Sequence, residues 1–105
     1  MPKKHRLTGA QIRSIRSSRR IHGTYLSLAL SPATGTLAVC ACVVSKKVAL
    51  SAVVRNRIKR RCRAALQSRI GKLPAGAYIF HAKRDAAHAT YADITADIVR
   101  ILGRT

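Results

Sequence analysis

The side chains best suited to chemistry are the cations that crowd residues 46–63. Six of the nine residues at positions 55–63 are Lys or Arg, while Val54, Ile58 and Cys62 recur at helical spacing. Like charges on adjacent turns repel, so such a helix is stable only if its apolar stripe is anchored and an anion covers its other side. A charge run is ordinarily a solvated face, but this density beside so few acids favours contact with RNA or DNA.

The charge of the whole chain supports the same interpretation. The 105 residues include 21 Lys and Arg against three Asp and Glu, which gives a formal net charge of +18. Arg outnumbers Lys fourteen to seven, and Arg favours bidentate phosphate contacts and stacking on bases. A partner must supply the counter-charge, and a phosphate backbone fits best because its binding releases condensed counterions. The strand-like alternation of residues 24–31 and the absence of Trp disfavour a membrane-surface peptide.

The length of the chain predicts one domain, 1–105, with a compact core. No apolar run reaches the roughly 18 residues of a membrane span. The first apolar run begins only at Tyr25, which is unlike a secretory signal, so we expect a cytoplasmic protein. Residues 1–22 are rich in Arg and Ser, as transit peptides are, but the entire chain is poor in acids and this feature discriminates little.

The acidic residues are too few for hydrolytic chemistry. Metal-assisted cleavage of a phosphodiester needs clustered carboxylates, and the chain has only Asp85, Asp93 and Asp97. We expect Asp93 and Asp97 to form an exposed pair on a helix and Asp85 to form an ion pair. No Ser-His or Cys-His arrangement is visible, so we predict no catalytic residue and no cofactor in this chain.

The three cysteines are predicted to be free thiols. Cys40 and Cys42 share one face of a strand and Cys62 lies on the apolar side of a helix, positions that favour packing. A zinc site would need a fourth ligand at a suitable spacing, and the histidines are scattered.

The periodicity of the sequence predicts a two-layer α+β domain. Residues 1–6 form a flexible basic arm, and Thr8 caps a short first helix that carries Ile12 and Ile15. Residues 24–31 alternate as a half-buried strand, and residues 36–45, apolar on both faces, form a central strand that pairs with it as an antiparallel hairpin. A short additional strand near Ile21 is also compatible with the pattern.

The second half of the chain predicts a helix, a strand and a helix. Ser51 caps the helix over residues 51–70, and Gly71 ends it. Residues 77–82 form a strand, and Thr90 with Asp93 starts the last helix as in a capping box. The core stripe of this last helix consists of Ile94, Ile98, Ile101 and Leu102.

The basic segment closely resembles the signature of the bacterial ribonuclease P protein family. That signature is a Lys-Lys pair followed by Ala-Val-x-Arg-Asn-Arg-x-Lys-Arg-x-x-Arg, and it is matched by Lys46, Lys47, Ala52, Val53, Arg55, Asn56, Arg57, Lys59, Arg60 and Arg63. The opening His5-Arg6-Leu7 and the late Ala82-Lys83-Arg84 resemble the flanks of the same family, so the resemblance covers nearly the whole chain in order.

This resemblance implies both a fold and a role. The fold would be similar to the second domain of ribosomal protein S5, in the order α-β-β-(β)-α-β-α, with the basic helix in a left-handed crossover. The role would be that of a ribonuclease P subunit that binds the catalytic RNA and the 5′ leader of precursor tRNA, with the catalytic centre and its magnesium on the RNA. No membrane and no obligate protein partner are implied. The implied RNA-binding residues are Lys46, Lys47, Arg55, Asn56, Arg57, Lys59, Arg60, Arg61 and Arg63.

The resemblance implies a cleft between the first helix and the sheet that holds the single-stranded leader, and the chain departs from the family pattern both there and just before the basic helix. Ile12 and Ile15 replace aromatic residues common in the first helix, and Leu50 and Ser51 stand where many members have Gly-Asn. We therefore assign the cleft to Ile12, Ile15 and Tyr25. Tyr25 is the best stacking platform, although packing against the first helix is an equally good interpretation of that residue.

Two other classes remain as alternatives. A small ribosomal protein would have the same composition, and only the ordered signature argues against it. A DNA-binding module would need a partner helix just before residues 51–70, where a strand is predicted instead.

Overall fold

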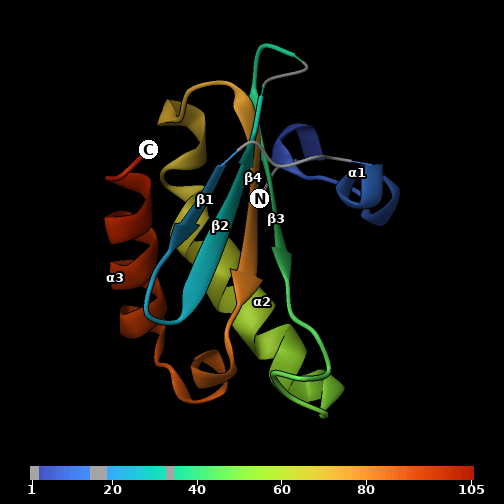
Figure 1. Cartoon of the computed structure of the whole chain (residues 1–105), viewed down its shortest axis with the longest axis vertical. Coiled ribbons are helices and arrows are strands. Elements are labelled where there is room, and N and C mark those ends of the chain that lie inside the picture. Colours follow the sequence, from blue (N-terminus) through green and yellow to red (C-terminus); the bar gives the residue numbers. More distant parts are fainter. Residues whose placement is uncertain (1–2, 15–18, 33–34) are drawn as a thin grey trace.

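The computed structural model describes residues 3–14, 19–32 and 35–105, with the backbone alone at positions 3, 13 and 14. Figure 1 shows a sheet whose one face is covered by two long helices, with a short helix beyond one sheet edge. The strands are β1 (Arg19–His22), β2 (Leu26–Ser31), β3 (Ala38–Val43) and β4 (Gly76–Ala82). The α-helices are α1 (Gly9–Ser14), α2 (Ala52–Gln67) and α3 (Tyr91–Leu102), and the short 3-10 helices are η1 (Lys3–His5), η2 (Ile70–Lys72) and η3 (Arg84–His88).

The strand order is β1-β2-β4-β3, so the predicted hairpin between residues 24–31 and 36–45 is wrong. Strand β4 lies between β2 and β3, antiparallel to the first and parallel to the second. The first five residues of β4 are all buried, and this strand takes the central place that the sequence analysis gave to residues 36–45. Strand β3 is an edge strand, and its apolar character arises because α2 and the N-terminal segment contact it. The additional strand near Ile21 is confirmed as β1.

The crossover from β3 through α2 to β4 is left-handed. In Figure 1 both strands run downward, α2 passes behind the sheet, and β4 lies on the β2 side of β3. Parallel crossovers are nearly always right-handed, so this path follows the family resemblance rather than the general rule. It places the start of α2 at the end of the molecule where β3 finishes.

The N-terminal segment is docked against β3, unlike the flexible arm expected for residues 1–6. The buried ring of His5 donates from Nδ1 to the carbonyl oxygen of Ala38 at 2.7 Å, and the Leu7 N–H donates to the Cys40 carbonyl oxygen at 3.1 Å. Arg6 forms a parallel bridge with Cys40. Backbone groups on the outer edge of β3 are thereby satisfied, and Arg6 is held beside the sheet.

A disulfide joins Cys42 of β3 to Cys62 of α2, so the prediction of three free thiols is wrong. Both residues lie on the sides of their elements that face the shared core, and their Cα atoms are 6.8 Å apart. Cys40 is a buried thiol, as the packing interpretation expected. Burial raises the pKa of the Cys40 thiol to about 11, against an opposing effect of Arg63 and Arg6.

Asp97 of α3 closes the turn between β1 and β2. Its fully buried carboxylate accepts hydrogen bonds from the backbone N–H groups of Thr24, Tyr25 and Leu26 at 2.8–2.9 Å, and Arg100 pairs with it at 3.1 Å. Burial alone would raise the pKa of this carboxyl, but these hydrogen bonds hold its pKa below the ordinary value.

The prediction that Asp97 is exposed is therefore wrong, because this residue shares the core-facing side of α3 with Ile98 and Ile101. The close approach of Asp97 to the β1–β2 turn also explains why position 23 is a glycine. A Cβ atom there would lie 2.6 Å from both Asp97 carboxylate oxygens and 2.7 Å from Ile101 Cδ1. Asp93 has a different role: it forms the predicted capping box with Thr90 at the start of α3.

We predict that Asp97→Ala destabilises the fold by about 3 kcal/mol, because three backbone donors, one buried and two partly buried, lose their acceptor. The folded-state pKa of Asp97 is lowered, so its stabilisation is complete above the unfolded value of about 3.9 and is lost as the pH falls through the folded value. Chemical denaturation between pH 2 and pH 7 measures both effects. Asp93→Ala is the control, with an expected loss near 1 kcal/mol; equal losses for both variants would contradict this role of Asp97.

Candidate nucleic-acid interface

Helix α2 begins at the predicted cap but ends at Gln67, with Ser68 as its C-cap, so the predictions that it reaches residue 70 and that Gly71 ends it are wrong: Gly71 lies in η2. Ser51 caps α2 by accepting a hydrogen bond from the Val54 N–H, and the buried stripe consists of Ile58, Cys62, Ala65 and Leu66. The stripe faces the sheet and α3, and the opposite side presents Asn56 and Arg60 to solvent. The charged side of α2 therefore points away from the core.

Two pockets flank the exposed side of α2 that carries Asn56 and Arg60, here called the ridge. The first, here called the β3 flank, has a volume of about 200 Å³ and is lined by Arg6, Lys59 and Arg63 together with Ile12 and residues 40–42. The second, here called the α3 flank, has a volume of about 340 Å³ and is lined by Arg57, Arg60, Arg61, Ala64 and Tyr91. Cations thus occupy both sides of the helix as well as its ridge.

Two of the predicted RNA-binding arginines also hold the backbone. Arg55 donates from one guanidinium nitrogen to the carbonyl oxygens of Ala49 at 2.9 Å and Leu50 at 2.7 Å, which closes the loop before α2. Arg61 donates to the Ala89 carbonyl oxygen at the end of η3. Because backbone carbonyl groups carry no formal charge, these hydrogen bonds do not neutralise the positive charge of Arg55 or Arg61.

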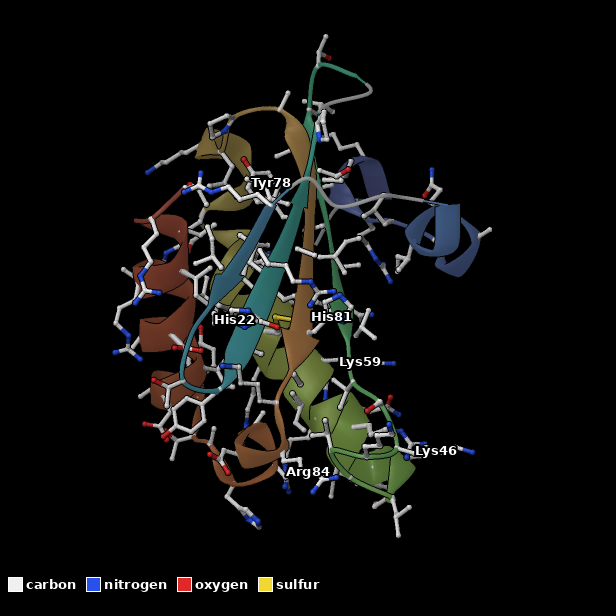
Figure 2. The ribbon with its side chains drawn as sticks, viewed as in Figure 1. His22, Lys46, Lys59, Tyr78, His81 and Arg84 are labelled. Atoms are coloured by element: carbon white, nitrogen blue, oxygen red, sulfur yellow. A yellow bond between two sulfur atoms is a disulfide. The ribbon has the colours of Figure 1, made fainter. Side chains whose placement is uncertain are left out.

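The remaining predicted residues lie on the same side of the molecule. Lys46 and Lys47 are exposed in the turn before α2, and Figure 2 shows Lys46 and Lys59 in the lower right part of the molecule, at the β3 side of α2. The loop and the helix together therefore form one continuous basic surface.

Of the three residues assigned to the leader cleft, the two that the structure describes, Ile12 and Tyr25, lie in different parts of the molecule. Ile12 is half-buried at the β3 flank, and Ile15 lies outside the described residues. Tyr25 packs against the hydrophobic core, and its backbone N–H donates to Asp97. Tyr25 precedes β2, which begins only at Leu26, and lies in the turn that Asp97 holds.

The sheet face opposite the helices carries residues that the sequence analysis missed. In register across the sheet, His22, Ser27 and His81 form one row, and Arg20, Ala29 and Ile79 form the next. Figure 2 shows His22 and His81 at the same level of the sheet. The sequence signal for this face is the pair of small side chains, Ser27 and Ala29, opposite a His and an Arg on β1. That signal can be recognised only once the pairing of β1 with β2 is known.

Burial lowers the pKa of His81, and the positive charge of Arg20 lowers it further. The imidazole is therefore neutral at pH 7, with one donor and one acceptor nitrogen and a flat ring face. A neutral ring beside a fixed cation suits a base together with its phosphate.

The three aspartates of this chain have different surroundings. Asp97 is committed to the turn and Asp93 to the capping box, while Asp85 is exposed and forms no ion pair with a described residue, contrary to expectation. Within the described ranges, no three His, Cys, Asp or Glu side chains gather as metal ligands would. None of the helices in those ranges has the length and apolar character needed to cross a membrane.

The sequence is similar to known proteins along its whole length. A family model described as Ribonuclease P matches residues 1–105. The ribonuclease P protein component of Thermus scotoductus is 41% identical over 91 residues, which cover 87% of this chain and 53% of that protein. The corresponding component of Acidothermus cellulolyticus is 36% identical over 99 residues, which cover 86% of this chain and 77% of that protein. The chain thus spans about half the length of the first relative and about three quarters of the second.

Solved structures confirm the α+β fold. The RNase P protein of Staphylococcus aureus superposes with a TM-score of 0.84 at 21% identity, over 95% of this chain and 94% of that one. The RNase P protein of Thermotoga maritima superposes with a TM-score of 0.73 at 16% identity, over 83% of each chain. The family model over the full length, together with relatives above 30% identity, shows that this chain belongs to the ribonuclease P protein family.

Proposed function

We propose that this chain is the protein subunit of a cytoplasmic ribonuclease P ribonucleoprotein and assists removal of the 5′ leader from precursor tRNA. The observation that carries the proposal is the placement of the family signature. The buried stripe of α2 turns Asn56 and Arg60 outward, with further cations on both flanks. A rigid helix that presents cations without carboxylates is suited to the phosphate backbone of a folded RNA.

The two faces of the molecule suggest a division of roles. The basic surface of α2 and its preceding loop would bind the catalytic RNA. The sheet face with His22, His81 and Arg20 would bind the single-stranded leader, in place of the cleft assigned from sequence. Leader contact through the neutral His81 ring and the Arg20 cation would compensate for the scarcity of exposed aromatic rings.

The chemistry itself is assigned to the RNA. None of the three aspartates is arranged to hold a metal ion, so the magnesium that the family implies would be bound by RNA phosphates. The protein would contribute by binding, orienting the substrate and neutralising phosphate charge. No obligate protein partner is needed for that contribution.

A small ribosomal RNA-binding protein is the alternative. Reconstitution separates the two: the chain is added to a bacterial ribonuclease P RNA at low magnesium and leader removal is measured. We expect faster cleavage at the mature 5′ end. Unchanged cleavage with folded protein, together with co-purification in ribosomal particles, would favour the alternative.

We predict that the protein alone does not cleave precursor tRNA and that Asp85→Ala leaves the chemical step of the reconstituted enzyme nearly unchanged. Asp85 is exposed and belongs to no cluster of metal-ligand side chains among the described residues, so we expect it to position no metal. Single-turnover cleavage under saturating enzyme measures the step. A large loss with folding and binding intact would place catalytic chemistry in the protein.

We predict that Arg60→Ala combined with Arg63→Ala leaves the fold intact but weakens binding of the catalytic RNA. The slope of log affinity against log salt should flatten by about 1.5–2, close to one for each lost phosphate contact. Ile58→Ala is the matched control on the same helix: it should cost about 2–5 kcal/mol of stability and leave the slope of the folded fraction unchanged. Unchanged affinity and slope in the double variant would show that α2 does not face the RNA.

We predict that leader binding strengthens as the pH falls below about 6.5, the ordinary His value, because protonated His81 adds a cation to the sheet face. Because the pKa of His81 is lowered, we expect the change in leader affinity below the ordinary His pKa rather than at it. His81→Phe keeps a ring but should remove the change. The assay compares affinities for precursors with a long leader and with a one-nucleotide leader; the same pH dependence for both substrates would rule out a leader contact.

A further inference from the structure

Tyr91 is the one aromatic side chain that the fold leaves largely uncovered. The chain has four aromatic residues, all within the described ranges. Tyr78 and Phe80 are buried and Tyr25 packs against the core, whereas Tyr91 is 49% exposed. It is the first residue of α3, and the capping box beside it is formed by Thr90 and Asp93 without any contribution from the ring. Neither the core nor the helix start therefore accounts for a tyrosine here.

The surroundings of this ring are unusually cationic. Tyr91 lines the α3 flank with Arg57, Arg60 and Arg61, and the small side chain of Ala64 completes the lining. Arg57 is half-buried, and its Nε atom is shielded and has no hydrogen-bond partner among the described residues. None of the aspartates forms an ion pair with these arginines; the nearest in sequence to the ring, Asp93, accepts from the Thr90 N–H. The positive charge of the pocket is thus left uncompensated within the described residues.

A flat exposed ring beside several guanidinium groups is the arrangement that binds an unpaired nucleotide. The ring offers a face on which any base can stack, and planar guanidinium groups pair with the adjoining phosphate oxygens. A cation–π contact within the protein would need only one of the three arginines. We propose that the α3 flank binds one unpaired nucleotide of the catalytic RNA, with its base stacked on Tyr91 and its phosphate held by Arg57 and Arg60.

This inference rests on the proposed function and refines it. The α3 flank belongs to the helix layer, whereas the His22–His81 row lies on the opposite face of the sheet. A leader on that face would lie across the sheet from Tyr91, so the nucleotide is assigned to the catalytic RNA rather than to the precursor. The nucleotide must be unpaired because a double helix hides the faces of its bases.

The test measures equilibrium binding of the catalytic RNA to the full chain over a range of salt concentrations. Tyr91→Ala should weaken binding by about 5- to 150-fold, the usual effect of one lost stacking contact, without changing the salt slope. Tyr91→Phe keeps the ring and should bind like the unaltered chain. Val99→Ala changes an equally exposed residue of α3 outside the pocket and should have no effect. Arg57→Gln should instead flatten the salt slope by about one.

The outcomes separate this site from the proposed function. If the unaltered chain does not bind the RNA or promote cleavage, the proposed function fails. If it does both and Tyr91→Ala binds equally well, the nucleotide site alone is wrong. Equal losses in Tyr91→Ala and Tyr91→Phe would contradict stacking, and a loss confined to the affinity for precursor tRNA would contradict the assignment to the catalytic RNA.

Discussion

The burial of one stripe of α2 against the sheet is the interaction on which the rest of the structure depends. Ile58, Cys62, Ala65 and Leu66 fix the rotation of the helix about its axis, and the disulfide from Cys62 to Cys42 adds a covalent link to β3. A helix with this density of positive charge would fray in isolation. Because the stripe is buried, α2 cannot rotate to move its cations apart. The cations therefore remain on the ridge and its two flanks.

The few carboxylates explain why this surface remains cationic. Asp97 is used to hold the backbone of the β1–β2 turn and Asp93 to begin α3, so neither neutralises the arginines of α2. Arg55 and Arg61 donate to backbone carbonyl oxygens, which orients their side chains without removing their charge. Folding therefore leaves an electrostatic cost that a bound polyanion would relieve, and this use of the acids supports the proposed binding of RNA.

Local patterns predicted the elements well, and interactions distant in sequence account for the errors. The Ser51 cap, the stripe of α2 and the Thr90 capping box depend on residues within a few positions of one another. The place of β4 between β2 and β3 depends on the whole crossover, so local turn residues wrongly favoured a hairpin. The buried state of Asp97 and the packing of Tyr25 depend on the turn that packs against α3, which no spacing in the sequence reveals. Family resemblance supplied the handedness and the proposed RNA-binding residues, but not the sheet face that carries His22 and His81.

The central claim, that the exposed side of α2 faces the catalytic RNA, is tested most directly by tethered cleavage. A hydroxyl-radical source is attached to a single exposed cysteine, introduced either as Val53→Cys on the first turn of α2 or as Leu37→Cys just before β3; both native side chains are exposed. The structure predicts localised cuts in the catalytic RNA from position 53 and weak or absent cuts from position 37. Equal cutting from both positions, or cutting only from position 37, would contradict it.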